Sequence, residues 1–138
     1  MTNDYFRDAY LRTTYIVQTG RGPIEIRVGG LNSDLDQFLA EQGMVQWAFI
    51  TASNPMSSVL SDEDNQRRHG EIIGRVVELG YRALEGSGQG YGTAWPPERS
   101  LMILGIDRDN AIDLAAKFGQ RAILVGRVNE LPELLMLA

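Results

Sequence analysis

The strongest evidence for the fold of this 138-residue chain is the stretch of residues 46–80, QWAFITASNPMSSVLSDEDNQRRHGEIIGRVVELG. It opens with QWAFITA, an apolar run with the length of a buried strand, and the run stops at Asn54-Pro55. A helix is predicted over residues 61–80, because Ser61 is a good N-cap, apolar residues recur with helical spacing, and Gly80 is a good stop. This order of strand and helix is the first half of a β-α-β unit.

The same alternation continues to residue 127. YRALEG (81–86) and SLMILGI (100–106) are predicted strands, RDNAIDLAAKFG (108–119) is a predicted helix, and RAILVG (121–126) is a further strand. The order β-α-β-β-α-β predicts an α+β fold with a ferredoxin-like, split β-α-β core over about residues 46–127.

The N-terminal third adds smaller elements to this core. TTYIVQTG and PIEIRVG predict a β-hairpin, since Ile24, Ile26 and Val28 alternate with charged residues. DLDQFLAEQ predicts a short helix capped by Asn32 or Ser33. The tail LPELLMLA is expected to cover an edge of the sheet or to be buried by a partner subunit. Residues 1–138 are predicted to form a single domain.

In this arrangement we expect QWAFITA and SLMILGI to be central, parallel neighbours. Parallel neighbours would bring the loops that follow them, Ser53–Leu60 and Asp107–Asn110, to the same rim of the sheet. Ligands of α/β proteins bind beyond the carboxyl ends of strands, so by analogy this rim is the expected site.

Composition excludes several classes of function. The net charge of -5 disfavours a protein that binds nucleic acid by neutralising its phosphates. The chain contains no cysteine, which excludes disulfides, thiolate nucleophiles and zinc–thiolate sites. The N-terminus lacks an apolar signal segment, and no run is long enough to span a bilayer. We therefore expect a cytoplasmic protein with no cofactor, no metal site and no membrane partner.

The loop ASNPMSS concentrates hydrogen-bonding side chains where a core strand ends. Asn54 and Ser57 could hold a polar ligand, although Asn-Pro and Ser-Ser also form ordinary turns. A phosphate is not expected at the following helix N-terminus, because Asp62, Glu63 and Asp64 already occupy it.

Two positions on that helix face the same loop. Asn65 and His69 are one turn apart, so both are expected to point inward beside Asn54. His69 is the single histidine and could act as a general acid or base near neutral pH. The alternative is a core-bordering histidine that hydrogen-bonds a carbonyl.

A glycine-rich connection precedes the strand SLMILGI. EGSGQGYGTAWPPER has neither GxGxxG nor P-loop spacing, so it predicts no nucleotide site. It is either a lid with Trp95 as a stacking surface or a connection without regular structure, and Glu98 follows it as a candidate carboxylate.

Five short blocks follow one another along the chain: AFITASNP, Asn65, the segment around WPPERS, LMILGI and KFGQRAI. Their order resembles a bacterial family catalogued as domain of unknown function 3293. Ser53 stands where an aromatic residue is common in the family, and Arg99 stands where proline is expected. The matching positions are Thr51, Ala52, Asn54, Pro55, Asn65, Trp95, Glu98, Ser100, Phe118, Gly119 and Gln120. The resemblance implies that the Asn-Pro block is a site, and it implies no reaction.

The leading hypothesis is a non-catalytic binding or regulatory domain. It would hold a small polar ligand or a partner peptide at a rim formed by Asn54, Ser57, Asn65 and His69, with Trp95 and Glu98 closing over it. One alternative is a small hydrolase or transferase with His69 or Glu98 as general base, which leaves open whether the chain is an enzyme. Another is a structural subunit that assembles into a homo-oligomer through its tail.

Overall fold

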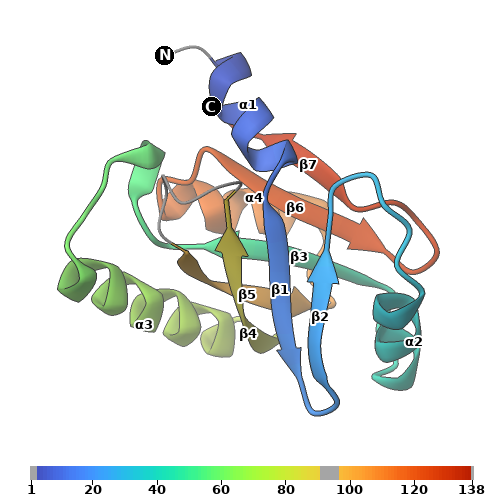
Figure 1. The fold of residues 1–138 in the computed structure, drawn as a ribbon. Coiled ribbons are helices and arrows are strands. Elements are labelled where there is room, and N and C mark those ends of the chain that lie inside the picture. Colours follow the sequence, from blue (N-terminus) through green and yellow to red (C-terminus); the bar gives the residue numbers. More distant parts are fainter. Residues whose placement is uncertain (1–2, 91–96, 138) are drawn as a thin grey trace.

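The structure is a computed structural model that describes residues 3–90 and 97–137 (Figure 1). Its described residues form a mixed α+β fold with four α-helices and one seven-stranded sheet. The elements are α1 (Asn3–Leu11), β1 (Thr14–Thr19), β2 (Gly22–Ile26), α2 (Ser33–Glu41), β3 (Gln46–Thr51), the 3-10 turn η1 (Pro55–Ser57), α3 (Asp62–Glu78), β4 (Arg82–Gln89), β5 (Glu98–Leu104), α4 (Arg108–Lys117), β6 (Ala122–Arg127) and β7 (Glu133–Met136).

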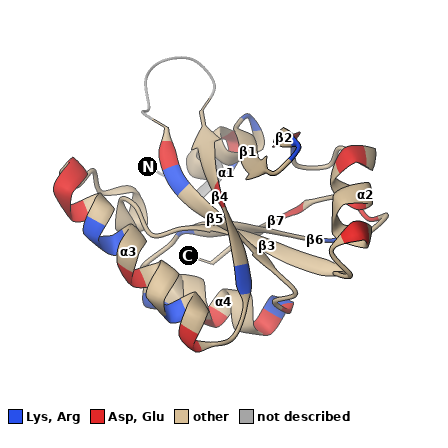
Figure 2. Ribbon diagram, turned by 90° about the horizontal axis from the view of Figure 1, so that it is seen from below, with Lys and Arg blue, Asp and Glu red and all other residues tan. Residues whose placement is uncertain are grey.

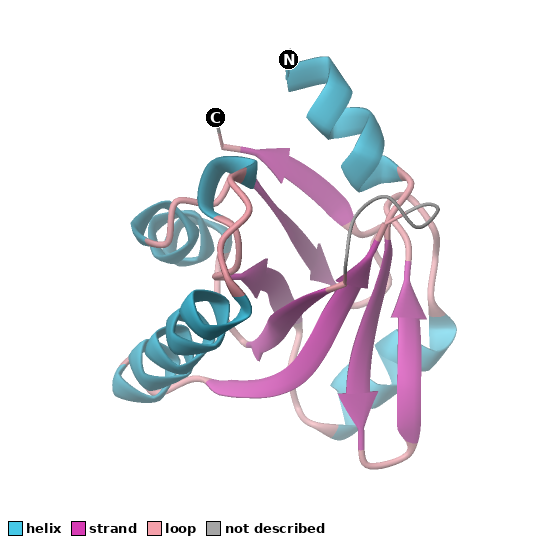
Figure 3. Cartoon of the chain, turned by 60° about the vertical axis from the view of Figure 1, so that its left-hand side comes forward, coloured by secondary structure: helices cyan, strands magenta, loops and turns pink. Residues whose placement is uncertain are grey.

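The sheet has the strand order β2-β1-β4-β5-β3-β6-β7, and every neighbouring pair is antiparallel. The sheet is strongly curled, as Figure 3 shows, and its two faces carry separate cores. The outer face packs against α3 and α4, and its core contains Ile50, Ile72 and Leu101. The inner, concave face packs around Trp47 and Phe49 and receives α2 at one end.

Glycine lets the inner face close around these aromatic rings. A Cβ on Gly126 would lie 2.4 Å from the Trp47 ring, and a Cβ on Gly86 would lie 2.6 Å from the Ile16 carbonyl oxygen and 2.8 Å from the Phe49 ring. Side chains at these two strand positions would therefore push the neighbouring strand or ring away. The Gly29 amide also donates to the Pro132 carbonyl (3.0 Å), which draws the two ends of the sheet toward each other.

Local signals place α2, α3 and α4 where the sequence predicts helices. Asn32, Ser61 and Asp107 cap α2, α3 and α4, and each side chain accepts a hydrogen bond from a backbone amide in the first turn. The first turn of α3 is acidic, and Figure 2 shows charged residues of both signs along this helix. Several of them form ion pairs at the exposed surface. The N-terminal hairpin, the short helix α2 and the order β-α-β-β-α-β are confirmed.

The expectation that β3 and β5 are parallel is wrong, because they are antiparallel neighbours. The tight pairing of β4 with β5 reverses the chain, so β5 runs opposite to β4 and to β3. The Gly105 amide at the end of β5 donates to the Gln46 carbonyl at the start of β3 (2.8 Å). The loops Ser53–Leu60 and Asp107–Asn110 therefore lie at opposite ends of these strands and do not form one rim.

Both ends of the chain add structure. The tail forms β7 and pairs with β6, so it covers an edge of the sheet as one of the two expectations had it. The helix α1 was not predicted, and it lies over the inner face near β7. No helix in the described residues has both the length and the apolar character needed to cross a membrane.

Candidate functional site

The loop after β3 has an unusual backbone. Asn54, Met56 and Ser57 have positive φ angles of 47°, 50° and 64°. Left-handed backbone costs a residue with a Cβ about 1–2 kcal/mol, with asparagine the most tolerant. Such strain persists only where surrounding contacts enforce it, and it is often found at binding sites.

The C-terminal end of α4 supplies these contacts. The Met56 amide donates to the Gly119 carbonyl (2.7 Å), and a Cβ on Gly119 would lie 2.9 Å from the Pro55 Cβ. The buried Gln120 side chain donates to the Ser53 carbonyl (3.1 Å). Gly119 and Gln120 thus hold the loop in its strained form.

Arg68 of α3 adds a second brace. Its Nε donates to the Ala52 carbonyl (2.6 Å), and its Nη2 donates to the Phe118 carbonyl. The loop is therefore fastened to both outer-face helices.

Asn54 is the centre of a hydrogen-bond network. Its side chain is buried, and its Oδ1 accepts from the Leu60 amide (2.9 Å) and from the Asn65 Nδ2 (2.9 Å). Its own amide donates to the Asn65 Oδ1 (3.0 Å). These bonds fix the orientation of the Asn54 amide, so its Nδ2 points at the Glu98 carboxylate (2.7 Å).

The network borders a cavity of about 620 Å³ between α1 and the inner face of the sheet. Asn54, Ser57, Glu98, Ser100, Gln120 and Arg121 form its polar end. Phe6, Tyr15, Phe49, Leu124 and Leu134 form its apolar walls. This volume and this mixture of linings are typical of small-molecule sites.

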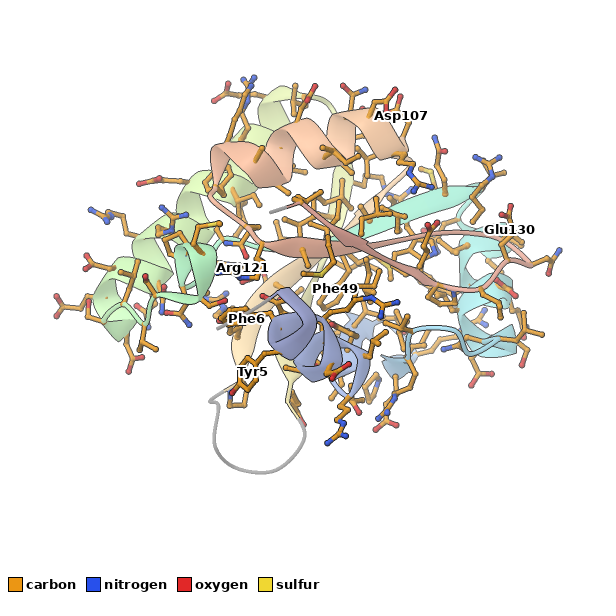
Figure 4. All side chains as sticks on the ribbon, turned by 90° about the horizontal axis from the view of Figure 1, so that it is seen from above. Tyr5, Phe6, Phe49, Asp107, Arg121 and Glu130 are labelled. Carbon is orange, nitrogen blue, oxygen red and sulfur yellow. The ribbon has the colours of Figure 1, made fainter. Side chains whose placement is uncertain are left out.

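The helix α1 closes the cavity with aromatic side chains. Phe6 lies against Arg121, whose guanidinium carbon is 3.9 Å from the ring centre, and Figure 4 shows the two beside Phe49. The Arg121 Nε donates to the Ser57 Oγ (3.3 Å), and its Nη2 donates to the Met56 carbonyl (3.2 Å). Arg121 therefore joins α1 to the strained loop.

Two tyrosines sit at the boundary between the polar end and the walls. Burial raises the pKa of Tyr10; the Glu98 charge also raises it, while a hydrogen bond with Ser57 and the Arg121 charge lower it. Burial also raises the pKa of Tyr15, whose hydroxyl donates to the Tyr10 carbonyl (3.0 Å). Both phenols are thus neutral hydrogen-bonding groups at physiological pH, and the Tyr10 hydroxyl lies in the field of both charged groups.

His69 belongs to the other face of the sheet. Residues alternate between faces along β5, so Glu98 and Ser100 face the cavity while Arg99 and Leu101 face α3. His69 is 2% exposed, and its Nε2 lies 2.9 Å from a Glu85 oxygen on that outer face. Its partner is a carboxylate, not the carbonyl of the alternative interpretation.

Glu85 receives a second contact from Arg99 (3.0 Å). Burial raises the Glu85 pKa, but the hydrogen bonds and charges of His69 and Arg99 outweigh it, so the pKa lies below its usual value. Because Glu85 and His69 point away from the cavity, they form a separate cluster.

The structure brings together four of the six predicted site residues. Asn54, Asn65 and Glu98 share one network, and Ser57 lies at the same end of the cavity. His69 lies apart on the outer face, and Trp95 lies outside the described residues. The glycine-rich connection begins later than expected, because β4 continues to Gln89 and pairs with β5.

Sequence reasoning missed Phe6, Tyr10 and Arg121. The signal for the first two was present: Phe6, Ala9, Tyr10 and Thr13 recur at helical spacing, and all four line the cavity. Arg121 directly follows Gln120, but no local pattern shows that its side chain reaches Ser57. Among the described residues, no three acidic or histidine side chains group in a way that could hold a metal ion.

Residues 50–123, more than half of the chain, match the family described as Protein of unknown function (DUF3293). The chain belongs to the DUF3293 family. No curated protein and no solved structure matches it significantly. The DUF3293 segment contains the Asn54 loop, α3, Glu98 and Arg121, whereas α1, which closes the cavity, precedes it.

The sequence blocks behind the DUF3293 resemblance converge in space. Thr51, Asn54, Glu98, Ser100 and Gln120 line the cavity. Asn65 and Gly119 do not line it but hold the Asn54 loop in place. Residues from three separate blocks therefore line one end of the cavity, and a fourth block, Asn65, is hydrogen-bonded to Asn54.

Proposed function

We propose that this DUF3293 chain is a non-catalytic binding domain that holds a small amphipathic molecule in the cavity under α1. The observation that carries the proposal is the cavity of about 620 Å³. The Asn54 loop, whose strained backbone is held in place by neighbouring side chains, contributes to its polar end. A turn with no role beyond connecting β3 to α3 would not require three left-handed residues, two of them not asparagine or glycine.

The chemistry of the lining supports a ligand with one polar end and one apolar end. Hydroxyl, amide and charged groups gather at Asn54, Ser57 and Glu98, while Phe49 and Leu124 line the walls. Apolar walls with a few fixed polar groups give affinity and orientation together. The site proposed at the expected rim thus moves to the inner face and keeps Asn54, Ser57, Asn65 and Glu98.

The remaining expectations stay proposals. They are a ferredoxin-like arrangement of β3 to β6 with α3 and α4, a bacterial origin, a cytoplasmic location, and partners that include neither nucleic acid nor a membrane. A partner peptide and a homo-oligomer built through the tail remain alternatives to the small ligand.

A hydrolase or transferase is the second candidate, and one observation favours it. Glu98 lies at the polar end of the cavity and is oriented by the Asn54 amide, as a general base would be. Since His69 faces away from the cavity, this candidate depends on Glu98.

The binding proposal can be tested with N-phenyl-1-naphthylamine, an uncharged dye whose fluorescence rises in apolar surroundings. We expect saturable binding of one dye per chain. Ala122 lines the cavity, so Ala122→Leu should weaken dye binding by about tenfold or more through lost space.

Ala116→Leu is the matched control, because Ala116 is exposed on α4 and the same atoms are added there. It should leave the dye affinity unchanged. Equal dye affinities in Ala122→Leu and wild type, with both proteins folded, would exclude the cavity as the binding site.

A further inference from the structure

We propose that the molecule held in this cavity is an organic cation, with an ammonium group at Glu98 and an aromatic or aliphatic body along the inner face. This inference rests on the proposed binding function and specifies the class of ligand. It follows from the contacts of Glu98 and Arg121 and from the aromatic groups of the cavity, whose lining also includes one charged side chain of each sign, Asp8 and Arg12.

Glu98 is the acceptor that the site presents to such a head group. Its carboxylate is half-buried at the polar end, and the Asn54 Nδ2 holds one oxygen at 2.7 Å. A carboxylate has about four acceptor positions, so it can accept hydrogen bonds from several donors at once. Because Asn54 is itself fixed by Leu60 and Asn65, the carboxylate is oriented before a ligand binds.

The positively charged group at this end of the cavity is Arg121, which forms part of the cavity wall. Arg121 donates to Ser57 and to the Met56 carbonyl, and its guanidinium lies over the Phe6 ring. These contacts hold the strained Asn54 loop and α1 together. An anionic head group near Glu98 would meet like charge, whereas an ammonium there would meet a carboxylate and several hydroxyl oxygens.

The aromatic groups strengthen the preference. Tyr15 and Phe49 pack edge to face with ring centres 5.4 Å apart, and both line the cavity beside the polar end. Aromatic faces attract cations through the ring quadrupole, most strongly where water is excluded. The apolar body of the ligand would lie against Phe49, Leu124 and Leu134.

The test compares three probes with the same phenylethyl body and different head groups. They are 2-phenylethylamine, which is protonated at neutral pH, 2-phenylethanol and 3-phenylpropionate. Each competes with N-phenyl-1-naphthylamine. We expect the amine to bind about tenfold or more tightly than the alcohol, because its ammonium adds a charge–charge attraction to the hydrogen bond with Glu98. The propionate should bind most weakly, because its carboxylate is repelled by Glu98.

Glu98→Gln should bring the amine and the alcohol to similar affinities. The matched control is Glu85→Gln on the outer face, which should keep the full preference for the amine. The comparison of the three probes on the wild-type protein decides the ligand class even where Glu98→Gln does not fold.

The failures of the two proposals are distinct. If the alcohol or the propionate displaces the dye as well as the amine does, the cation is excluded and the cavity remains a binding site. If Glu98→Gln folds and keeps the preference for the amine, Glu98 is not its partner. If the dye does not bind, or binds Ala122→Leu equally well, the binding function itself fails.

Discussion

Two helices of nine residues cover the two ends of the concave face of the sheet, and they do so differently. The helix α2 buries Leu35 and Leu39 completely against Trp47 and fills its end. The helix α1 brings Phe6 and Tyr10 over the other end and leaves a cavity of about 620 Å³. One face of one sheet is therefore closely packed at one end and encloses a cavity at the other.

Polar groups are also distributed unevenly between the α1 end and the α2 end of the concave face. The strained Asn54 loop, its hydrogen-bond network, Glu98 and Arg121 lie at the α1 end. The α2 end buries apolar side chains, and its hydrogen bonds, such as the one from the Asn129 amide to the Asp36 carboxylate (3.0 Å), lie at the exposed surface. Strain and buried polarity both cost stability, so their concentration beside the cavity supports a binding role for that end.

The largest expected effect is a contrast between the two helices in the free energy of unfolding. Leu39→Ala should lower it by about 2–5 kcal/mol, because a fully buried leucine leaves a void in a packed core. Phe6→Ala should lower it by about 1 kcal/mol, since Phe6 borders space that is already empty and loses mainly its contact with Arg121. Urea denaturation measures both.

Equal losses in Leu39→Ala and Phe6→Ala would contradict the distinction between a packed end and an open one. The dye-binding assay supplies the complementary readout, since Phe6→Ala should weaken dye binding and Leu39→Ala, where it stays folded, should not.

A smaller effect is expected from Asn54, where two variants separate the network from the backbone. Asn54→Gly keeps the left-handed conformation but removes three side-chain hydrogen bonds, which should cost about 1–3 kcal/mol. Asn54→Ala should cost about 1 kcal/mol more, because alanine is strained at this φ. Equal urea midpoints for the two variants would show that the backbone here is not strained.

The smallest expected effect concerns the outer face and acid pH. The folded Glu85 pKa lies below the ordinary value of 4.5, so its contribution to stability is present above that value and is lost as the pH falls through the folded pKa. Glu85→Gln should therefore be less stable than wild type at neutral pH, and the difference should shrink in acid.

Urea midpoints measured from neutral into acid pH test this expectation. A difference that does not change with pH would show that Glu85 contributes nothing through its charge. Dye affinity should be the same in Glu85→Gln and wild type, because Glu85 faces away from the cavity.

Sequence reasoning predicted the parts of the fold that local chemistry determines. The caps Asn32 and Ser61 and the stop Gly80 all lie at the ends of helices, and their preferences act over a few residues. Strand direction is a long-range property, and the antiparallel pairing of β3 with β5 follows from the β4–β5 hairpin and not from any residue pattern.

The site was predicted only in part, because its residues are brought together by long-range pairing in the sheet. The Asn-Pro block and the acidic Glu98 were visible in the sequence, and pairing in the sheet brings them together. Alternation along β4 and β5 decides which residues reach the cavity, and it places Glu98 inside and Glu85 with His69 outside. α1 closes the cavity because of where it packs on the sheet, and no short sequence pattern indicates that position.

Binding in the cavity under α1 is tested most directly by titrating the isotope-labelled protein with whichever phenylethyl probe binds most tightly and recording ¹H–¹⁵N correlation spectra. We expect the largest shifts at the Asn54 side-chain amide and at the backbone amides of Ser57 and Ser100, with little change at Leu35, Leu39 or His69. Largest shifts along α2 or on the α3 face, with the Asn54 amide unmoved, would contradict binding in this cavity.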